Sequence, residues 1–242
     1  MQAEVYTCRN GLTAIVSRQA AFPVVSVQVW VGTGSEHEGE HAGAGLSHLL
    51  EHMVFKGAGG YSAQQLNEEV AALGGLWNAY TTTDRTVYHI DGPSAQWQQF
   101  LHILMQLVFR PTFPEAEVAT YCDKRRQQLS IERRKVETKA REEFAHAMFG
   151  ESHPYGISYP ESEYDNLCRD YVEEHYRRRY TAQNCIVVCS GQISDKVLER
   201  IVAIAEQIPT AGEATHIEFP PFATRHSGQV QHDGAVQSSI RI

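Results

Sequence analysis

The feature that most constrains the fold of this sequence is a run of β-branched residues that leads, through a glycine-rich loop, into an amphipathic segment. Residues 23–31, PVVSVQVWV, are typical of a central β-strand. The loop 32–45 follows, and over residues 46–55 the apolar side chains recur at helical spacing. Residues 57–60 break that spacing, so the sequence predicts a helix of about three turns directly after a buried strand.

The rest of the chain consists of blocks of strands and blocks of helices. Strand-like runs at 4–8 and 12–17 flank Asn10-Gly11, which predicts an opening hairpin. The other predicted strands are 76–82, 86–91 and 185–190, and the other predicted helices are 62–74, 94–109, 114–149, 170–180 and 195–208. Because strict strand–helix–strand alternation is missing, we predict an α+β fold in which helices cover a mostly antiparallel sheet.

The character of the sequence changes after residue 210. Residues 1–210 carry the periodic segments and, with 42% hydrophobic residues in the whole chain, can bury an ordinary core. Residues 211–235 have little periodicity, which predicts a linker. Residues 236–242, VQSSIRI, resemble the first residues of a strand. We therefore expect one domain, a linker and the start of a truncated second domain.

Charge and cysteine usage restrict the partners and the compartment. The net charge of −8 argues against nucleic acid or an anionic membrane as the main partner. There is no leader-like N-terminus and no run of apolar residues long enough to span a bilayer. The five cysteines are scattered without a CxxC pair, which fits a reducing cytoplasm, or the periplasm if a leader was removed.

Three chemically active residues lie within the predicted helix 46–55. His48, Glu51 and His52 are spaced i, i+3 and i+4, so they project from one side, opposite the apolar residues. Two imidazoles one turn apart can bind one Zn²⁺, which lowers the pKa of a bound water towards about 7, and Glu51 can act as general base. His37 and His41, in the preceding loop, are interpreted as polar loop residues.

The residues around this motif resemble a known family. The stretch 45–90 closely resembles the N-terminal half of the pitrilysin, insulinase and mitochondrial processing peptidase family, which carries an inverted His-x-x-Glu-His motif. The matching landmarks are Phe55-Lys56-Gly57, Gly74-Gly75, Asn78-Ala79, Thr86-Val87-Tyr88, His153-Pro154-Tyr155-Gly156 and the strand sequence NCIVVCSGQI.

The resemblance implies a zinc endopeptidase that acts on peptides or unfolded segments. It implies that His48 and His52 bind Zn²⁺ and that Glu51 is the general base. Asn78 and Ala79 would lie on an edge strand that pairs with an extended peptide substrate. The family encloses its substrate between two similar halves, so the resemblance implies a C-terminal domain or a paired subunit, as in a dimer, as partner.

The sequence departs from the family at the third zinc ligand. The family places a glutamate about seventy-five residues after the second histidine, with another acidic residue about two turns earlier. Those positions hold Gln128 and Tyr121 here, and an amide is a weak zinc ligand. Glu132, one turn beyond Gln128, is the candidate third ligand, and Glu117 is a more remote candidate.

Two functions therefore stay open at the level of sequence. The first is a zinc-dependent endopeptidase domain, which the intact His48, Glu51 and His52 favour. The second is a non-catalytic family subunit that serves as a structural or peptide-binding partner, which Gln128 favours. Metal content discriminates between them, because a peptidase must hold zinc.

Overall fold

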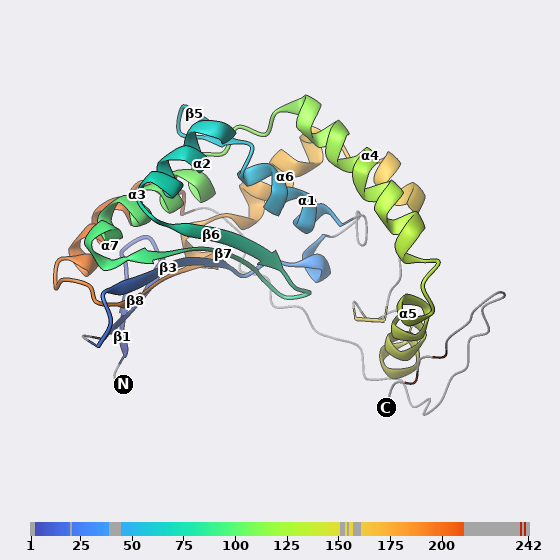
Figure 1. Cartoon of the computed structure of the whole chain (residues 1–242), viewed down its shortest axis with the longest axis horizontal. Coiled ribbons are helices and arrows are strands. Elements are labelled where there is room, and N and C mark those ends of the chain that lie inside the picture. The colour runs from blue at the N-terminus through green and yellow to red at the C-terminus, as the bar shows by residue number, and fades with distance from the viewer. Residues whose placement is uncertain are drawn as a thin grey trace.

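A six-stranded sheet with helices on one face forms the fold, as seen in the computed structural model (Figure 1). The structure describes residues 3–19, 21–38, 45–150, 153, 155–156, 161–210, 238 and 240. The strand order is β1-β2-β8-β3-β7-β6, in which β2 and β8 are parallel and the other neighbours are antiparallel. The strands are β1 Ala3–Thr7, β2 Thr13–Arg18, β3 Val24–Val31, β6 Leu76–Thr81, β7 Thr86–Pro93 and β8 Cys185–Gly191, with a small separate pair of β4 Gly57–Ala58 and β5 Tyr61–Ser62. The predicted α+β class is confirmed.

Strand β3 lies inside the sheet because its sequence alternates. Val25, Val27, Val29 and Val31 are buried under the helices, whereas the residues between them are partly exposed. The strand pairs with β8 on one side and β7 on the other. The prediction of a central strand at 23–31 is confirmed, and the opening hairpin around Asn10-Gly11 is confirmed as β1 and β2.

The helices fall where the periodicity predicted them, with one difference. They are α1 Leu46–Val54, α2 Ala63–Ala72, α3 Trp97–Phe109, α4 Glu115–Glu132, α5 Val136–Phe149, α6 Arg169–Arg179 and α7 Val197–Ala205, with short 3-10 turns η1 Ser35–His37, η3 Ser94–Gln96, η4 Glu161–Asp165 and η5 Ala182–Asn184. Ser62 caps α2, since its Oγ accepts from the Gln65 N–H at 3.2 Å. Within the described ranges, no helix is long and apolar enough to cross a membrane.

The predicted continuous helical stretch 114–149 is wrong in one respect, because it consists of two helices. Helix α4 ends at Glu132, and Lys135 has an extended backbone before α5 begins. Three consecutive cations, Arg133, Arg134 and Lys135, follow the last residue of α4. Positive charge is favourable beyond a helix C-terminus, where the last carbonyl groups point, so the basic run suits a helix end better than a helix interior.

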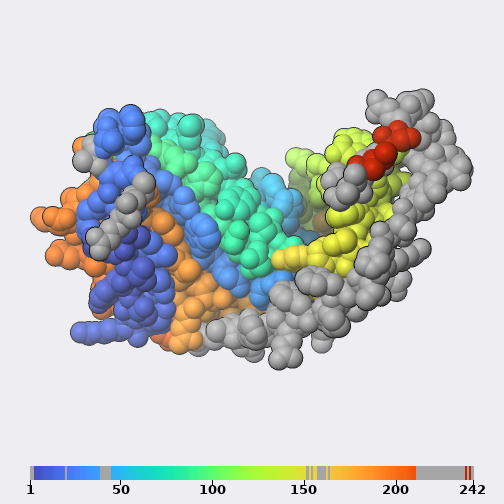
Figure 2. All heavy atoms as spheres, turned by 90° about the horizontal axis from the view of Figure 1, so that it is seen from below, coloured from blue at the N-terminus to red at the C-terminus, as the bar shows by residue number. Residues whose placement is uncertain are grey.

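The helices differ in how firmly the core holds them. Helix α1 packs between β6 and α6, and α3 lies across β3 and β7. Helix α5 stands away from the sheet and has a single buried residue, Ala147 (Figure 1). In the space-filling view, the yellow-green residues of α4 and α5 lie to one side of the sheet. The surface dips between these two helices on one side and the sheet on the other (Figure 2). Apart from 238 and 240, the predicted linker and second domain lie outside the described residues, and that division stays a prediction.

Candidate metal centre

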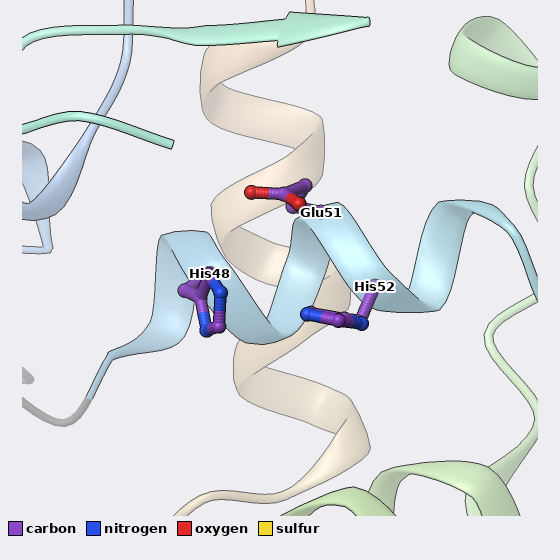
Figure 3. A group of neighbouring side chains, drawn as sticks. All are labelled: His48, Glu51 and His52. Atoms are coloured by element: carbon purple, nitrogen blue, oxygen red, sulfur yellow. The ribbon is translucent and has the colours of Figure 1, made fainter. Parts of the chain in front are cut away.

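The candidate metal centre lies on one side of α1. Leu46, Leu49, Leu50, Met53 and Val54 are at most 1% exposed and fix the opposite side of the helix in the core. The remaining side carries His48, Glu51 and His52, whose ligand atoms all lie within 4.8 Å of one another. The two imidazole rings lie edge to face with their centroids 4.7 Å apart, and Glu51 lies between the two histidines along the helix (Figure 3). The predicted convergence of these three residues is therefore present in the structure.

The Glu51 carboxylate is buried and bonded to strand β6. The residue is 7% exposed, and Thr81 donates a hydrogen bond from Oγ1 to Glu51 Oε2 at 2.6 Å. Burial raises the pKa of Glu51, and the Thr81 hydrogen bond partly opposes that rise. A carboxylate with a raised pKa is a better proton acceptor near neutral pH than an exposed one. No sequence pattern indicates Thr81 as a site residue, because its contact with Glu51 joins residues thirty positions apart.

Both histidines are held in the neutral form. Burial, together with the neighbouring His52 and Arg125, lowers the pKa of His48 to about 4. Burial, Lys56 and Arg125 likewise lower the pKa of His52. A neutral imidazole offers a lone pair to a metal, so both side chains are in the state that zinc requires at neutral pH. Two neutral imidazoles beside a carboxylate fit the nitrogen and oxygen ligands of Zn²⁺.

Helix α4 approaches the same group through Tyr121. The Tyr121 hydroxyl shares a hydrogen bond with His48 Nδ1, and its ring lies 4.9 Å from the His52 ring, centroid to centroid. The sequence marked Tyr121 as the position where the family has an acidic residue, but no local spacing could predict that its hydroxyl meets His48. The contact depends on how α4 packs across α1.

The two candidates for a third ligand contact each other. Gln128 donates from Nε2 to Glu132 Oε1 at 2.9 Å, and Arg125 lies 3.5 Å from Glu132 Oε2. Among the described residues, Glu132 does not join the group of potential ligands formed by His48 and its neighbours. Its role as a ligand stays a prediction. The more remote candidate, Glu117, is paired with Lys56 at 2.7 Å.

The predicted substrate strand is an edge of the sheet. Strand β6 pairs with β7 on one side, and no other strand among the described residues pairs with it. Asn78 is exposed, and its Oδ1 accepts from the N–H of Ala79 at 2.9 Å. The far end of β6 holds Thr81, which reaches Glu51. An extended segment beside β6 would therefore run past the carboxylate.

The start of α1 is held by a residue that the sequence did not reveal. Glu38 is 4% exposed, and its two carboxylate oxygens accept from the N–H groups of Leu46 and Ser47 at 3.0 and 2.9 Å. A carboxylate at a helix N-terminus accepts hydrogen bonds from N–H groups that lack a partner within the helix. Its negative charge also interacts favourably with the positive end of the helix dipole. The cap lies outside the spacing of a capping box, so sequence patterns give no signal for it.

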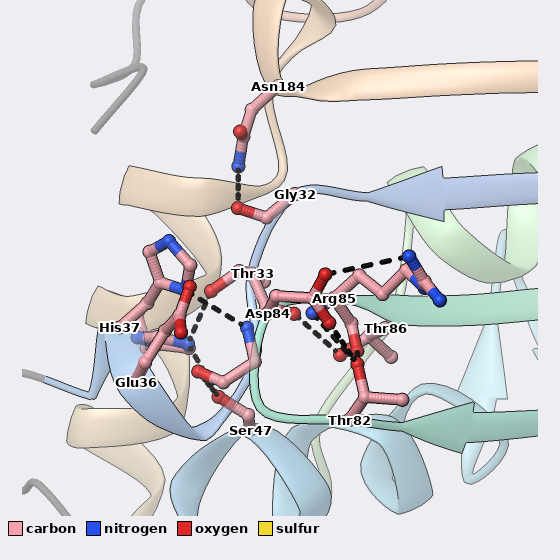
Figure 4. Close-up of polar contacts among 12 residues, drawn as sticks. Gly32, Thr33, Glu36, His37, Ser47, Thr82, Asp84, Arg85, Thr86 and Asn184 are labelled. Carbon is pink, nitrogen blue, oxygen red and sulfur yellow. Dashed lines mark hydrogen bonds and ion pairs between the residues drawn. The ribbon is translucent and has the colours of Figure 1, made fainter. Parts of the chain in front are cut away.

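The side chains of Ser47 and His37 both bond to the backbone of Gly34. Ser47 donates from Oγ to the carbonyl of Gly34 at 3.0 Å, and the Gly34 N–H donates to His37 Nδ1 at 3.3 Å (Figure 4). Burial lowers the pKa of His37 to about 4. His37 thus has the structural role expected of a loop residue, whereas His41 lies outside the described residues.

Comparison with known proteins identifies relatives of this chain. Residues 14–160 match the family model described as insulinase, peptidase family M16. An uncharacterized zinc protease of Bacillus subtilis, YmxG, is 29% identical over 226 residues, covering 90% of this chain and 54% of that protein. A probable mitochondrial-processing peptidase subunit beta of Arabidopsis thaliana is 26% identical over 206 residues, covering 83% of this chain and 38% of that protein.

Solved structures show the same fold. The peptidase M16 inactive domain from Pseudomonas fluorescens superposes with a TM-score of 0.83 at 18% identity, covering 91% of this chain and 54% of that chain. Likeness at this identity concerns the fold alone. The present chain spans about half the length of the Bacillus relative and less of the Arabidopsis one.

Proposed function

The chain belongs to the insulinase family, peptidase family M16, and we propose that it is a zinc-dependent endopeptidase domain. The observation that carries the proposal is the convergence of His48, Glu51 and His52 within 4.8 Å, with both histidines neutral and the carboxylate buried. His48 and His52 would hold the zinc ion, and Glu51 would be the general base. When bound, zinc would activate a water molecule and polarise the peptide carbonyl.

Residues of the protein would carry out the proton transfer. Glu51 would take a proton from the attacking water and return it to the leaving amine. Its raised pKa supports both steps, because a buried carboxylate holds a proton more readily than an exposed one. The Thr81 hydrogen bond to Oε2 would keep the carboxylate oriented while the proton moves.

The substrate would be an extended peptide or an unfolded segment added to the sheet at β6. A peptide strand gains affinity from main-chain hydrogen bonds at such an edge. Asn78 and Ala79 would make these contacts. The peptide carbonyl would replace the Asn78 side chain at the N–H of Ala79, which the Asn78 Oδ1 bonds in the structure.

Completion of the site would need a further ligand and a second half. Glu132 would be the further protein ligand, and it would have to leave Gln128 and Arg125 to reach the zinc ion. The chain spans 54% of the Bacillus relative, so a C-terminal domain or a paired subunit would cover the substrate from the opposite side.

A second candidate function is a non-catalytic subunit that binds peptides or stabilises a partner. One specific observation favours it: the two positions that the family resemblance assigns to acidic residues hold Tyr121 and Gln128, and Gln128 is bonded to Glu132. Such a subunit would keep the β6 edge for peptides without needing a complete set of zinc ligands.

Cleavage of a fluorogenic peptide library by the zinc-supplemented chain tests the proposal. The wild-type chain should cleave measurably, although slowly without a second half, whereas Glu51→Gln should bind zinc without cleaving. Glu68→Gln, on the exposed side of α2, should behave as wild type. Peptide binding with zinc bound but without cleavage in the wild type would support the non-catalytic function instead.

A further inference from the structure

Tyr121 contacts both candidate zinc histidines, although it belongs to neither their helix nor their motif. It lies in the second turn of α4, where its ring packs against His52 at a 45° interplanar angle. Its hydroxyl meets Nδ1 of His48. Helix α4 therefore supplies a polar group to the metal site through Tyr121.

The hydrogen bond at Nδ1 determines which nitrogen of His48 can bind a metal. A neutral imidazole has one N–H and one lone pair. If Nδ1 carries the hydrogen and donates it to the Tyr121 oxygen, the lone pair is on Nε2. Metal-binding histidines commonly use the second nitrogen in this way, and loss of the outer partner typically costs about 10–100-fold in metal affinity.

A phenol is suited to this role in a buried place. A tyrosine phenol is neutral at pH 7, so its oxygen can accept a hydrogen bond without adding a charge beside Arg125. An acidic residue at the same position would accept the same hydrogen bond but would bring a negative charge. The phenol therefore replaces the orienting effect of an acid and not its electrostatic effect.

We propose that Tyr121 is a positioning residue of the metal site, which accepts the Nδ1–H of His48 and thereby leaves Nε2 available to the metal. The inference rests on the proposed zinc binding by His48 and His52. It names a residue of α4 that orients one ligand without being a ligand itself.

Zinc titration of the intact chain against a chromophoric chelator tests the role of the hydroxyl. Tyr121→Phe keeps the ring contact with His52 and removes the hydroxyl, so zinc affinity should fall about 10–100-fold. Tyr121→Glu restores an acceptor and should bring the affinity back to within a few-fold of wild type. Tyr176→Phe is the matched control, since it removes another tyrosine hydrogen bond, 3.0 Å long and made to the Val108 carbonyl, and should leave zinc affinity unchanged.

A spectroscopic readout separates positioning from general loss of structure. In the zinc-loaded wild type, ¹⁵N NMR of His48 should show a protonated Nδ1 and a metal-bound Nε2. In Tyr121→Phe, the Nδ1–H signal of His48 should broaden or shift, while the melting temperature of the metal-free protein should match that of Tyr176→Phe.

The possible outcomes distinguish this inference from the function on which it rests. Equal or tighter zinc binding by Tyr121→Phe, with zinc bound to the wild type, overturns the role of Tyr121 and leaves the metal site intact. A metal-bound Nδ1 in His48 overturns it as well. No zinc on the wild type overturns the proposed function and the inference together.

Discussion

Helices α1 and α4 face each other across the candidate metal centre, but the protein holds them very differently. Six residues of α1 are at most 1% exposed, and Glu38 caps its first turn. Helix α4 is twice as long, yet Val118 and Cys122 are its buried residues. The ligands on α1 are thus fixed by the core, whereas the contribution of α4 depends on which side chains its exposed turns bring forward. Whether such a metal site has a full set of ligands therefore depends on the side chains that α4 supplies.

The largest expected effect comes from the firmly held side. Glu51→Gln should lower peptide hydrolysis by about 10²–10⁴-fold, the usual contribution of a general base, while zinc binding persists. The same change removes a buried carboxylate, so thermal unfolding should shift upward by about 2–4 °C. Hydrolysis and calorimetry of one variant measure both effects. Unchanged hydrolysis would remove Glu51 from the mechanism.

The second-largest expected effect concerns the residues of α4. Gln128→Glu supplies a carboxylate where the family resemblance expects one, and zinc affinity should rise by about tenfold, or ~1.4 kcal/mol. Glu132→Ala should lower zinc affinity if Glu132 leaves Gln128 and Arg125 to bind the ion, and should have little effect if Glu132 stays bonded to them in the zinc-loaded wild type. Zinc titration of both variants decides the matter. A large loss in Glu132→Ala would identify Glu132 as the third ligand.

Acidification should lower the free energy of unfolding of the protein. The pKa of His48 is lowered to about 4 from an ordinary value of 6.5, so between these values the unfolded chain binds more protons than the folded chain. Stability should therefore fall as pH decreases from about 6.5 to about 4, by on the order of 1–2 kcal/mol after solvent screening.

Urea unfolding at several pH values measures this loss. His48→Gln should flatten the pH dependence, while His102→Gln, at an exposed position of α3, should leave it as in wild type. His37, whose pKa burial also lowers to about 4, contributes with the same sign, so part of the pH dependence should remain in His48→Gln. An identical pH dependence in wild type and His48→Gln would contradict the assignment.

The smallest expected effect concerns the edge strand. Asn78→Ala removes the side chain that bonds the Ala79 N–H and should change peptide affinity by about threefold, or ~0.6 kcal/mol. Fluorescence anisotropy with a labelled extended peptide measures this change. Gln64→Ala, on the exposed side of α2, is the control. Peptide binding that is insensitive to every substitution on β6 would place the substrate elsewhere.

The contrast between the helices also explains what the sequence could and could not predict. The periodicity of β3 and α1 reflects burial on one face, so the central strand and the convergence of His48, Glu51 and His52 follow from local spacing. Gln128 was found by counting along the family pattern. Counting gives a position along a helix, but the contacts at that position depend on tertiary packing.

Three contacts at the site were beyond local reasoning for the same reason. Thr81 reaches Glu51 from another strand, Glu38 caps α1 across a loop, and Tyr121 meets His48 from another helix. Each pair is separated in sequence and comes together when the sheet and helices pack. No spacing rule connects such residues before the fold is known.

The most direct test of the account is the zinc content of the purified chain after mild chelation and addition of zinc, compared with His48→Ala and His52→Ala. We expect one tightly bound zinc ion per wild-type chain, and its loss in each histidine variant, because two imidazoles on adjacent turns share the ion. Absence of bound zinc in the wild type, or equal binding by the histidine variants, would contradict the claim that α1 carries a metal centre.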